Sequence, residues 1–166
     1  MKKLLTIFAI VFATGAFAKP GFYQTIDDET NKPKSIIVVY EYDGGKLGGR
    51  IIALYGDDGK ISETLDKPVK TADKVKGKPF IAGLDMIWDM KKDGDEYTGG
   101  RIMDPKSGSV YRSVMWQEKN EADKIRVRGK VGPFGRTQVW NVLSVSDLPA
   151  ELQKLDTSGW TPNIAE

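Results

Sequence analysis

The chain has 166 residues and contains neither cysteine nor histidine. It therefore cannot have disulfides, thiolate nucleophiles, Ser-His-Asp triads or histidine-based zinc sites. The 25 basic residues nearly balance the 23 acidic ones, and no long basic tract occurs, which argues against nonspecific nucleic-acid binding. We therefore predict no metal site, no cofactor and no nucleic-acid partner.

The first 18 residues have the layout of a secretory signal peptide. Lys2 and Lys3 precede an apolar run over Leu4–Ala13, and Ala16-Phe17-Ala18 forms a small-x-small cleavage site. A transmembrane helix needs roughly 20 apolar residues, so this run is too short to be one. We expect cleavage after Ala18 and export to the periplasm or the medium. The remaining chain would not span a membrane, and loss of two lysines would leave 23 basic and 23 acidic residues.

Residues 19–145 are expected to form a single β-barrel domain. Short segments rich in β-branched and aromatic residues alternate with turn residues. The expected strands cover residues 21–26, 35–43, 46–56, 80–92, 96–104, 109–117, 124–131 and 136–143. Most connections are short, but residues 57–79 form a long polar one. About eight strands joined in this way predict an all-β, antiparallel up-and-down barrel of the lipocalin or calycin type. An outer-membrane barrel is disfavoured, since charges fall on both faces of several strands.

Residues 146–166 differ from the rest. The segment SDLPAELQKL, residues 146–155, has leucines at the spacing of a short amphipathic helix, which we expect to pack on the barrel through Leu148, Leu152 and Leu155. The tail after it is expected to be loose. Within the barrel, Ile36–Val39 is apolar on both faces, so both faces of that strand must be covered.

All six arginines fall in expected strands, whereas most lysines fall in turns and in the long connection. Arginine pairs bidentately with carboxylates, so we expect most of them to form cross-strand ion pairs outside the barrel. Arg128 and Arg136 are the exceptions: we expect one of them to bind an anionic group or to help close the barrel. A bulge at Gly129 would re-aim Arg128. The hairpin that contains both is expected to turn at Gly132–Gly135.

Other residues are candidates for ligand binding or barrel closure, although each also has a purely structural interpretation. The aromatic residues are ordinary core fillers. Asp104 begins an Asp-Pro turn signal between two strands. No spacing singles out a catalytic pair of carboxylates, so no catalytic residue is assigned. The full set of candidates is Tyr23, Trp88, Asp104, Tyr111, Arg128, Arg136 and Trp140.

The sequence from Gly21 to Val142 resembles the bacterial domain-of-unknown-function family 2147. The resemblance rests on GFYQTIDDETNKPKSIIVVYEYDGGKLGGRI, on GKPFIAGL, on DGDEYTGGRIMDPKSGSVYRS and on KIRVRGKVGPFGRTQVW. It implies a small, exported, lipocalin-like barrel without an established activity, and it supplies no catalytic residues.

Two departures from that family's pattern matter. Its first strand usually runs Gly-x-Trp, where this chain has Gly21-Phe22-Tyr23. By analogy with lipocalin-like barrels, Tyr23 would take the place of the tryptophan ring, with Arg128 or Arg136 over it. Many members carry a cysteine pair in the long connection, and this chain has lysines there, which removes any metal or redox role that the pair would suggest.

Three functions remain open. The leading hypothesis is a non-catalytic binding module for a small amphipathic or anionic ligand, because of the barrel size and the strand arginines. The alternative is a structural or interaction protein of the cell envelope, which would use the aromatic strands and the leucine face of the C-terminal helix on a protein partner. An enzyme is the third, and the missing histidine and cysteine weaken it.

Overall fold

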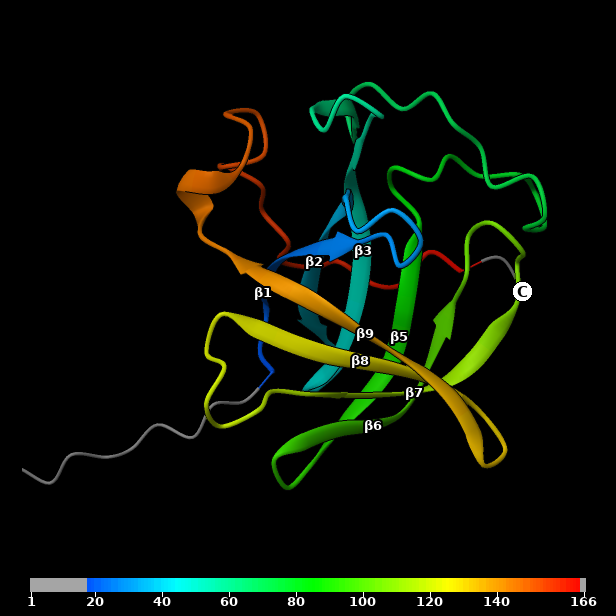
Figure 1. Ribbon diagram of the computed structural model, residues 1–166, viewed down its shortest axis with the longest axis vertical. Coiled ribbons are helices and arrows are strands. Elements are labelled where there is room, and N and C mark those ends of the chain that lie inside the picture. Colours follow the sequence, from blue (N-terminus) through cyan, green and yellow to red (C-terminus); the bar gives the residue numbers. More distant parts are fainter. Residues whose placement is uncertain (1–17, 165–166) are drawn as a thin grey trace, which may run out of the picture.

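The computed structural model describes residues 18–164, so all of the expected signal peptide except Ala18 lies outside the described residues. Nine strands make up almost all of the regular structure (Figure 1). They are β1 (Gly21–Ile26), β2 (Pro33–Tyr42), β3 (Lys46–Tyr55), β4 (Ile61–Thr64), β5 (Asp85–Asp93), β6 (Glu96–Met103), β7 (Val110–Trp116), β8 (Lys124–Val131) and β9 (Phe134–Leu143).

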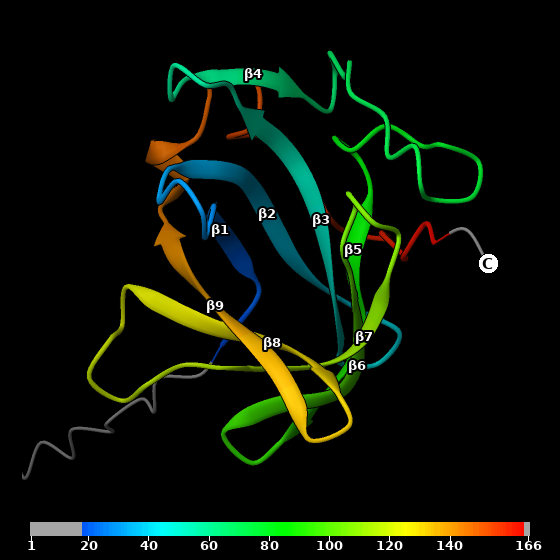
Figure 2. The ribbon, with the colours of Figure 1, turned by 45° about the vertical axis from the view of Figure 1, so that its right-hand side comes forward.

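Eight of these strands form a closed antiparallel barrel. The barrel strands are all but β4, and each pairs with the next of them along the chain, so that β3 pairs with β5. The barrel is closed by β1 and β9, which pair with Tyr23 opposite Val142. The short β4 pairs only with β3, at the edge of the barrel (Figure 2). The predicted all-β up-and-down barrel is therefore confirmed. Strand β4 was not predicted, because it lies within the segment that we expected to be a long polar connection. The last hairpin turns at Gly132-Pro133 between β8 and β9, which is a tighter turn than the expected Gly132–Gly135, because Phe134 and Gly135 already belong to β9.

The barrel interior is filled by side chains from alternating strand positions. Its largest fully buried members include Tyr23, Met90, Met115 and Trp140. Alternate residues of a strand point to opposite faces, and burial follows this rule. In β8, for example, Ile125 and Val127 are buried, while Arg126 between them is not.

A second apolar cluster lies outside the barrel, on β2 and β3. Ile36 and Ile52 belong to it, and both are covered by Leu148 and Leu152 from the C-terminal segment. Leu148 is 4% exposed and Leu152 is 1% exposed, so the expected packing of these leucines on the barrel is confirmed. The doubly apolar segment Ile36–Val39 is covered on both faces, as its sequence required.

The expected α-helix over residues 146–155 is wrong. The segment forms one 3₁₀ turn, Val145–Asp147, followed by successive turns that bring the leucines to the barrel. Pro149 has no N–H, and it restricts Leu148 to the extended conformation that this residue adopts, with φ −81° and ψ 152°. Because Leu148 is extended, only residues 149–155 of the expected helix remain, and so short a segment does not form a stable α-helix by itself.

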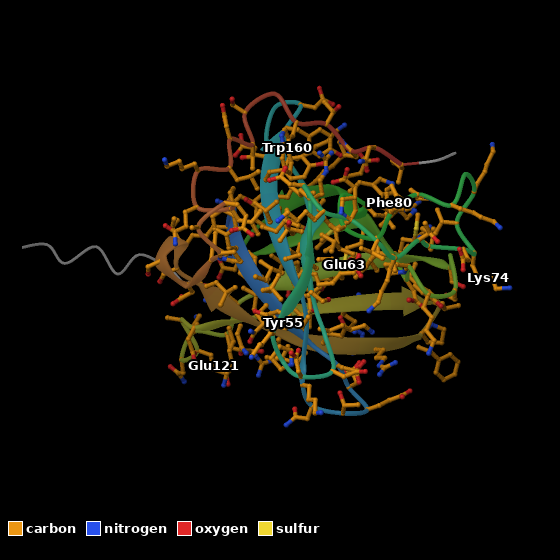
Figure 3. All side chains as sticks on the ribbon, turned by 90° about the horizontal axis from the view of Figure 1, so that it is seen from above. Tyr55, Glu63, Lys74, Phe80, Glu121 and Trp160 are labelled. Carbon is orange, nitrogen blue, oxygen red and sulfur yellow. The ribbon has the colours of Figure 1, made fainter. Side chains whose placement is uncertain are left out.

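The tail is not loose, which corrects the second expectation for this region. Trp160 meets Tyr40 edge to face, with the ring centroids 5.4 Å apart. Asn163 donates its backbone N–H to the Asp85 carboxylate at 2.8 Å, and its side-chain oxygen accepts from the backbone N–H of Asp85 at 3.1 Å. Figure 3 shows Trp160 outside the barrel, on the side of β2 and β3. The end of the described chain is therefore bound to the barrel wall.

Asp85 is the centre of this attachment. Its side chain is fully buried and accepts hydrogen bonds from the Tyr40 hydroxyl at 2.7 Å and from Arg50 Nε and Nη2 at 3.1 and 2.7 Å. The Arg50 guanidinium also lies 4.2 Å from the centre of the Trp160 ring. We expected most arginines to form cross-strand ion pairs, and Arg50 does so with Asp85, its partner in the β3–β5 register. The pair is less exposed than we expected, since the Arg50 side chain is only 14% exposed.

The Tyr40 hydroxyl gives the fold a pH dependence. Burial, and next its hydrogen bond to Asp85, raise the pKa of Tyr40 well above its ordinary value of 10.0. Unfolded Tyr40 ionises near pH 10, whereas folded Tyr40 stays neutral, so its contribution to stability is present below about pH 10 and is lost as pH rises further. We expect urea denaturation at rising pH to show a smaller loss of unfolding free energy for Tyr40→Phe than for the wild type. Equal losses would contradict this role, since Tyr23, Tyr42 and Tyr97, whose pKa values are also raised, are unchanged in the variant.

A third apolar cluster forms where the long connection folds back on the barrel. Ala72 and Val75 from the connection are buried with Leu84 and Met103. Trp88 packs against this cluster from β5 while remaining half-buried. The connection therefore fixes one side of the Trp88 indole and leaves the rest of the ring near solvent.

Candidate functional site

Three of the aromatic candidates are parts of the barrel core. Tyr23 and Trp140 are almost fully buried in the interior, and Tyr111 packs against the same cluster. The Tyr23 hydroxyl donates to the Lys19 carbonyl at 2.5 Å, and the Trp140 indole donates to Gln138 Oε1 at 3.1 Å. The polar atoms of Tyr23 and Trp140 are thus hydrogen-bonded within the chain. Ser113 Oγ is a buried polar atom of the interior that has no hydrogen-bond partner within residues 18–164.

Asp104 stabilises a turn between two strands, as its Asp-Pro turn signal predicted. Its carboxylate accepts from the backbone N–H of Lys106 at 3.0 Å and from the Ser107 hydroxyl at 2.8 Å. Its own backbone N–H donates to the Ser109 carbonyl at 2.9 Å. These bonds hold the connection between β6 and β7.

The expected contact of Arg128 or Arg136 with Tyr23 is not formed within residues 18–164, and that prediction is wrong. The register between β8 and β9 is regular through Gly129, so no bulge re-aims Arg128, which lies near Thr137 at 3.5 Å. Arg136 pairs with Asp28 at 2.5 Å, and its side chain is 70% exposed. An arginine does lie over aromatic rings in this protein, but it is Arg50.

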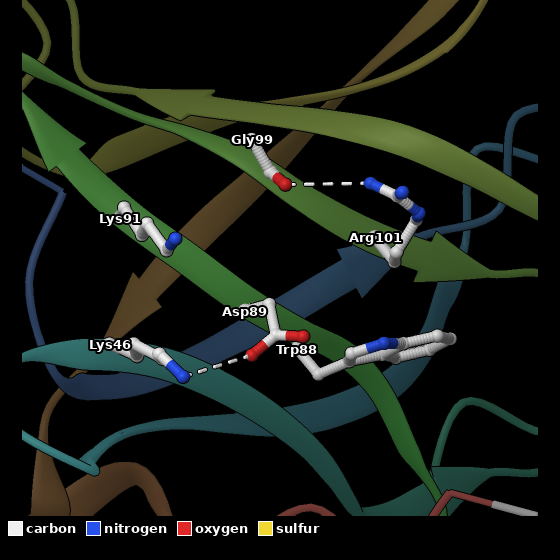
Figure 4. Close-up of a pocket in the computed structure, with 6 residues that line it drawn as sticks. All are labelled: Lys46, Trp88, Asp89, Lys91, Gly99 and Arg101. Atoms are coloured by element: carbon white, nitrogen blue, oxygen red, sulfur yellow. Dashed lines mark hydrogen bonds and ion pairs between the residues drawn. The ribbon is translucent and has the colours of Figure 1, made fainter.

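Trp88 lies at an open hollow on the outside of the barrel, across β3, β5 and β6 (Figure 4). The hollow has a volume of about 380 Å³. Its lining comes from three strands: Lys46, Trp88, Asp89, Lys91, Gly99 and Arg101. We call it the β5–β6 pocket.

Local backbone geometry brings these side chains together. Trp88 and Arg101 are cross-strand partners in β5 and β6, so the indole and the guanidinium lie on the same face. Asp89 has a left-handed backbone, with φ 56°, where the β3–β5 register breaks. This conformation is uncommon for a residue other than glycine, and the Tyr42 hydroxyl supports it. That hydroxyl accepts from the Asp89 backbone N–H at 2.9 Å and donates to its carboxylate at 3.0 Å.

The charges of the β5–β6 pocket do not balance, because three cations face one carboxylate. Lys46 lies 3.6 Å from Asp89 and 2.8 Å from Asp43, and the hydrogen bond with Asp43 raises its pKa. Arg101 donates to the Gly99 and Gly100 carbonyls, at 3.4 and 3.3 Å. Neither Arg101 nor Lys91 has a carboxylate partner within residues 18–164. The pocket is thus positive and has an indole in its wall.

A second open hollow of about 390 Å³ lies on the outside of β7 and β8. Arg128 contributes to it, so this candidate does line a surface hollow, although not the barrel interior. The other lining residues are Glu96, Val114, Trp116, Lys130, Gly132 and Pro133. The Trp116 indole is bonded to Glu118 at 2.9 Å.

Sequence reasoning identified Trp88 and missed the cations beside it. Arg101 could have been found by pairing the two strands that flank the Asp93-Gly94 turn, since that pairing puts it opposite Trp88. The sequence did not indicate that Lys46 and Lys91 lie near Trp88, because their positions beside it depend on the irregular pairing of β3 with β5.

Two further classes of site are absent from residues 18–164. No group of three or more aspartate, glutamate, histidine or cysteine side chains there is arranged to hold a metal ion. In the same residues, none of the helical segments has the length and apolar character needed to cross a lipid bilayer.

Comparison with known proteins supplies a family and one structural neighbour. The solved structure of a Helicobacter pylori protein, HP1028, described as belonging to the lipocalin family, matches with a TM-score of 0.64 and 24% sequence identity. The match covers 84% of this chain and 91% of that one, and it supports a lipocalin-like barrel. No curated protein gives a significant match. The profile of an uncharacterised family conserved in bacteria, DUF2147, matches residues 21–142, and the chain therefore belongs to that family.

Proposed function

We propose that the protein is an exported, non-catalytic binding barrel that holds a small amphipathic anion in the β5–β6 pocket. The observation that carries this proposal is the Trp88–Arg101 pair. The two residues are cross-strand partners, the indole is half-buried, and the guanidinium has no carboxylate partner within residues 18–164. A flat apolar group could lie against the indole while its anionic group bonds the guanidinium. The export part of the proposal rests on the signal-like first 18 residues.

The charge of the pocket supports an anion rather than a cation or a neutral molecule. Lys91 and Arg101 are both exposed and have no carboxylate partner within residues 18–164, whereas Lys46 lies near both Asp43 and Asp89. Burying the anion of a ligand beside them would give charge-assisted hydrogen bonds, each worth more than a neutral one. The volume of about 380 Å³ is at the lower end of the range for small-molecule sites.

The filled interior supports an external site. Tyr23, Met115 and Trp140 occupy the space that a ligand would need inside an eight-stranded barrel. The leucine face gives the envelope-protein alternative less support, because Leu148 and Leu152 are buried on the chain's own β2 and β3.

A titration with 8-anilinonaphthalene-1-sulfonate, which joins an aromatic body to a sulfonate, tests the proposal. We expect saturable binding, and the double variant Lys91→Ala/Arg101→Ala should bind about tenfold more weakly, since each charged hydrogen bond contributes about 1.5–3 kcal/mol before solvent screening. The matched control Lys67→Ala/Lys154→Ala removes the same charge elsewhere and should bind like the wild type. Equal affinity of the two double variants would contradict the assignment of the pocket.

A further inference from the structure

The tip of the β8–β9 hairpin exposes large apolar side chains. Val131 and Phe134 are cross-strand partners there, and they are 60% and 78% exposed. Val110, 47% exposed, begins β7 two residues before Arg112, which is opposite Lys130 of β8. The register thus puts Val110 at the same end of the barrel. Figures 1 and 2 show the hairpin projecting from the barrel. Grouped apolar side chains in this position are typical of an interaction site.

Unpaired cations adjoin this apolar tip. Arg112 lies between Arg101 of β6 and Lys130 of β8 as cross-strand partner of both. Like charges opposite one another destabilise a sheet. The arginines that have carboxylate partners within residues 18–164 are Arg50, Arg126 and Arg136, so Arg112 and Arg128 have none there. An external anion would offset the repulsion within this row.

We propose that this end of the barrel docks on an anionic membrane surface. The docking surface consists of Val110, Arg112, Arg128, Lys130, Val131 and Phe134. Phe134 and Val131 enter the interface between headgroups and acyl chains, while Arg112, Arg128 and Lys130 contact lipid phosphates. Apolar side chains combined with basic ones give this kind of binding, to which each cation near an anionic surface contributes separately.

The apolar tip distinguishes a membrane from a soluble polyanion. A nucleic acid or another polyanion would use the cations of the docking surface but would gain little from Val131 and Phe134. A bilayer uses both. The chain as a whole is close to neutral, so the attraction depends on this local separation of charge rather than on net charge.

Vesicle co-sedimentation tests the proposal. The probes are vesicles of phosphatidylglycerol with phosphatidylethanolamine, and vesicles of phosphatidylcholine alone. We expect binding to the anionic vesicles only, weakened by high salt. Arg112→Glu/Lys130→Glu should bind more than tenfold more weakly, since each cation lost near the surface costs about fivefold. Val131→Ser/Phe134→Ser should also lose most of the binding.

The controls make the same changes elsewhere. Lys119→Glu/Lys154→Glu repeats the charge reversal, and Val69→Ser removes an apolar side chain that is 70% exposed on the long connection. Both should bind like the wild type, and so should Lys91→Ala, which separates this surface from the β5–β6 pocket. Thermal unfolding checks that each variant folds, and mass spectrometry checks that all share one N-terminus.

Two results would overturn the proposal. One is that the wild-type protein does not bind anionic vesicles at low salt. The other is full vesicle binding by Val131→Ser/Phe134→Ser together with binding of the wild type to single-stranded DNA, which would assign the cations to a polyanion instead.

Discussion

Replacing Asp85 with alanine is expected to lower the free energy of unfolding by about 3–5 kcal/mol, the range found when one member of a buried ion pair is removed. The substitution would leave the guanidinium of Arg50, whose side chain is only 14% exposed, without its carboxylate. It would also remove the acceptor of the Tyr40 hydroxyl and of the Asn163 backbone N–H. The barrel wall and the tail would therefore be weakened together.

Urea denaturation followed by tryptophan fluorescence measures this effect. Asp93→Ala is the matched control, because it removes an exposed carboxylate from the end of the same strand. Surface substitutions of this kind usually change stability by less than about 0.5 kcal/mol. A loss for Asp85→Ala no larger than that of Asp93→Ala would show that the buried cluster contributes nothing of consequence.

Leu152→Ala is expected to destabilise the protein by about 2–5 kcal/mol, although residue 152 lies beyond the last strand. Leu152 is 1% exposed and packs on Ile36, Ile52 and their neighbours on the outside of the barrel. Truncating it leaves a cavity over a sheet face that would otherwise meet water. The C-terminal segment is thus a part of the core rather than an appendage.

Thermal unfolding of Leu152→Ala beside Lys154→Ala tests this prediction, since Lys154 is exposed in the same segment. Lys154→Ala should unfold at close to the wild-type temperature. If Leu152→Ala also did so, the leucines would be dispensable for the barrel, and their availability to a protein partner would return as a hypothesis.

The barrel could be predicted from the sequence because its signals are local. Hairpin turns and the alternation of Ile125 and Val127 with basic residues depend on neighbours within a few positions. The C-terminal helix failed for a local reason too, since the effect of Pro149 on Leu148 outweighed the leucine spacing.

The buried cluster and the pocket could not be predicted, because they depend on contacts between distant segments. Asn163 meets Asp85 from 78 positions away, and nothing near either residue indicates the other. Arg50 and Arg101 look alike in the sequence. The tail buries Arg50, whereas Arg101 is left without a carboxylate partner within residues 18–164. The sequence therefore could not distinguish the arginine with a structural role from the arginine available to bind a ligand, because the difference depends on the fold.

The four tryptophans allow one direct test of where a ligand binds, because their indole N–H groups report from four places. Trp88 lies at the β5–β6 pocket and Trp140 in the interior. Trp116 lies at the second hollow, and Trp160 lies in the tail, against the outer cluster on β2 and β3. In a ¹⁵N-resolved NMR titration with 8-anilinonaphthalene-1-sulfonate, we predict that the Trp88 indole signal shifts with the backbone signals of Lys91 and Arg101, while that of Trp140 stays in place. A shift of Trp140 with Trp88 unmoved would contradict the external site and put the ligand inside the barrel.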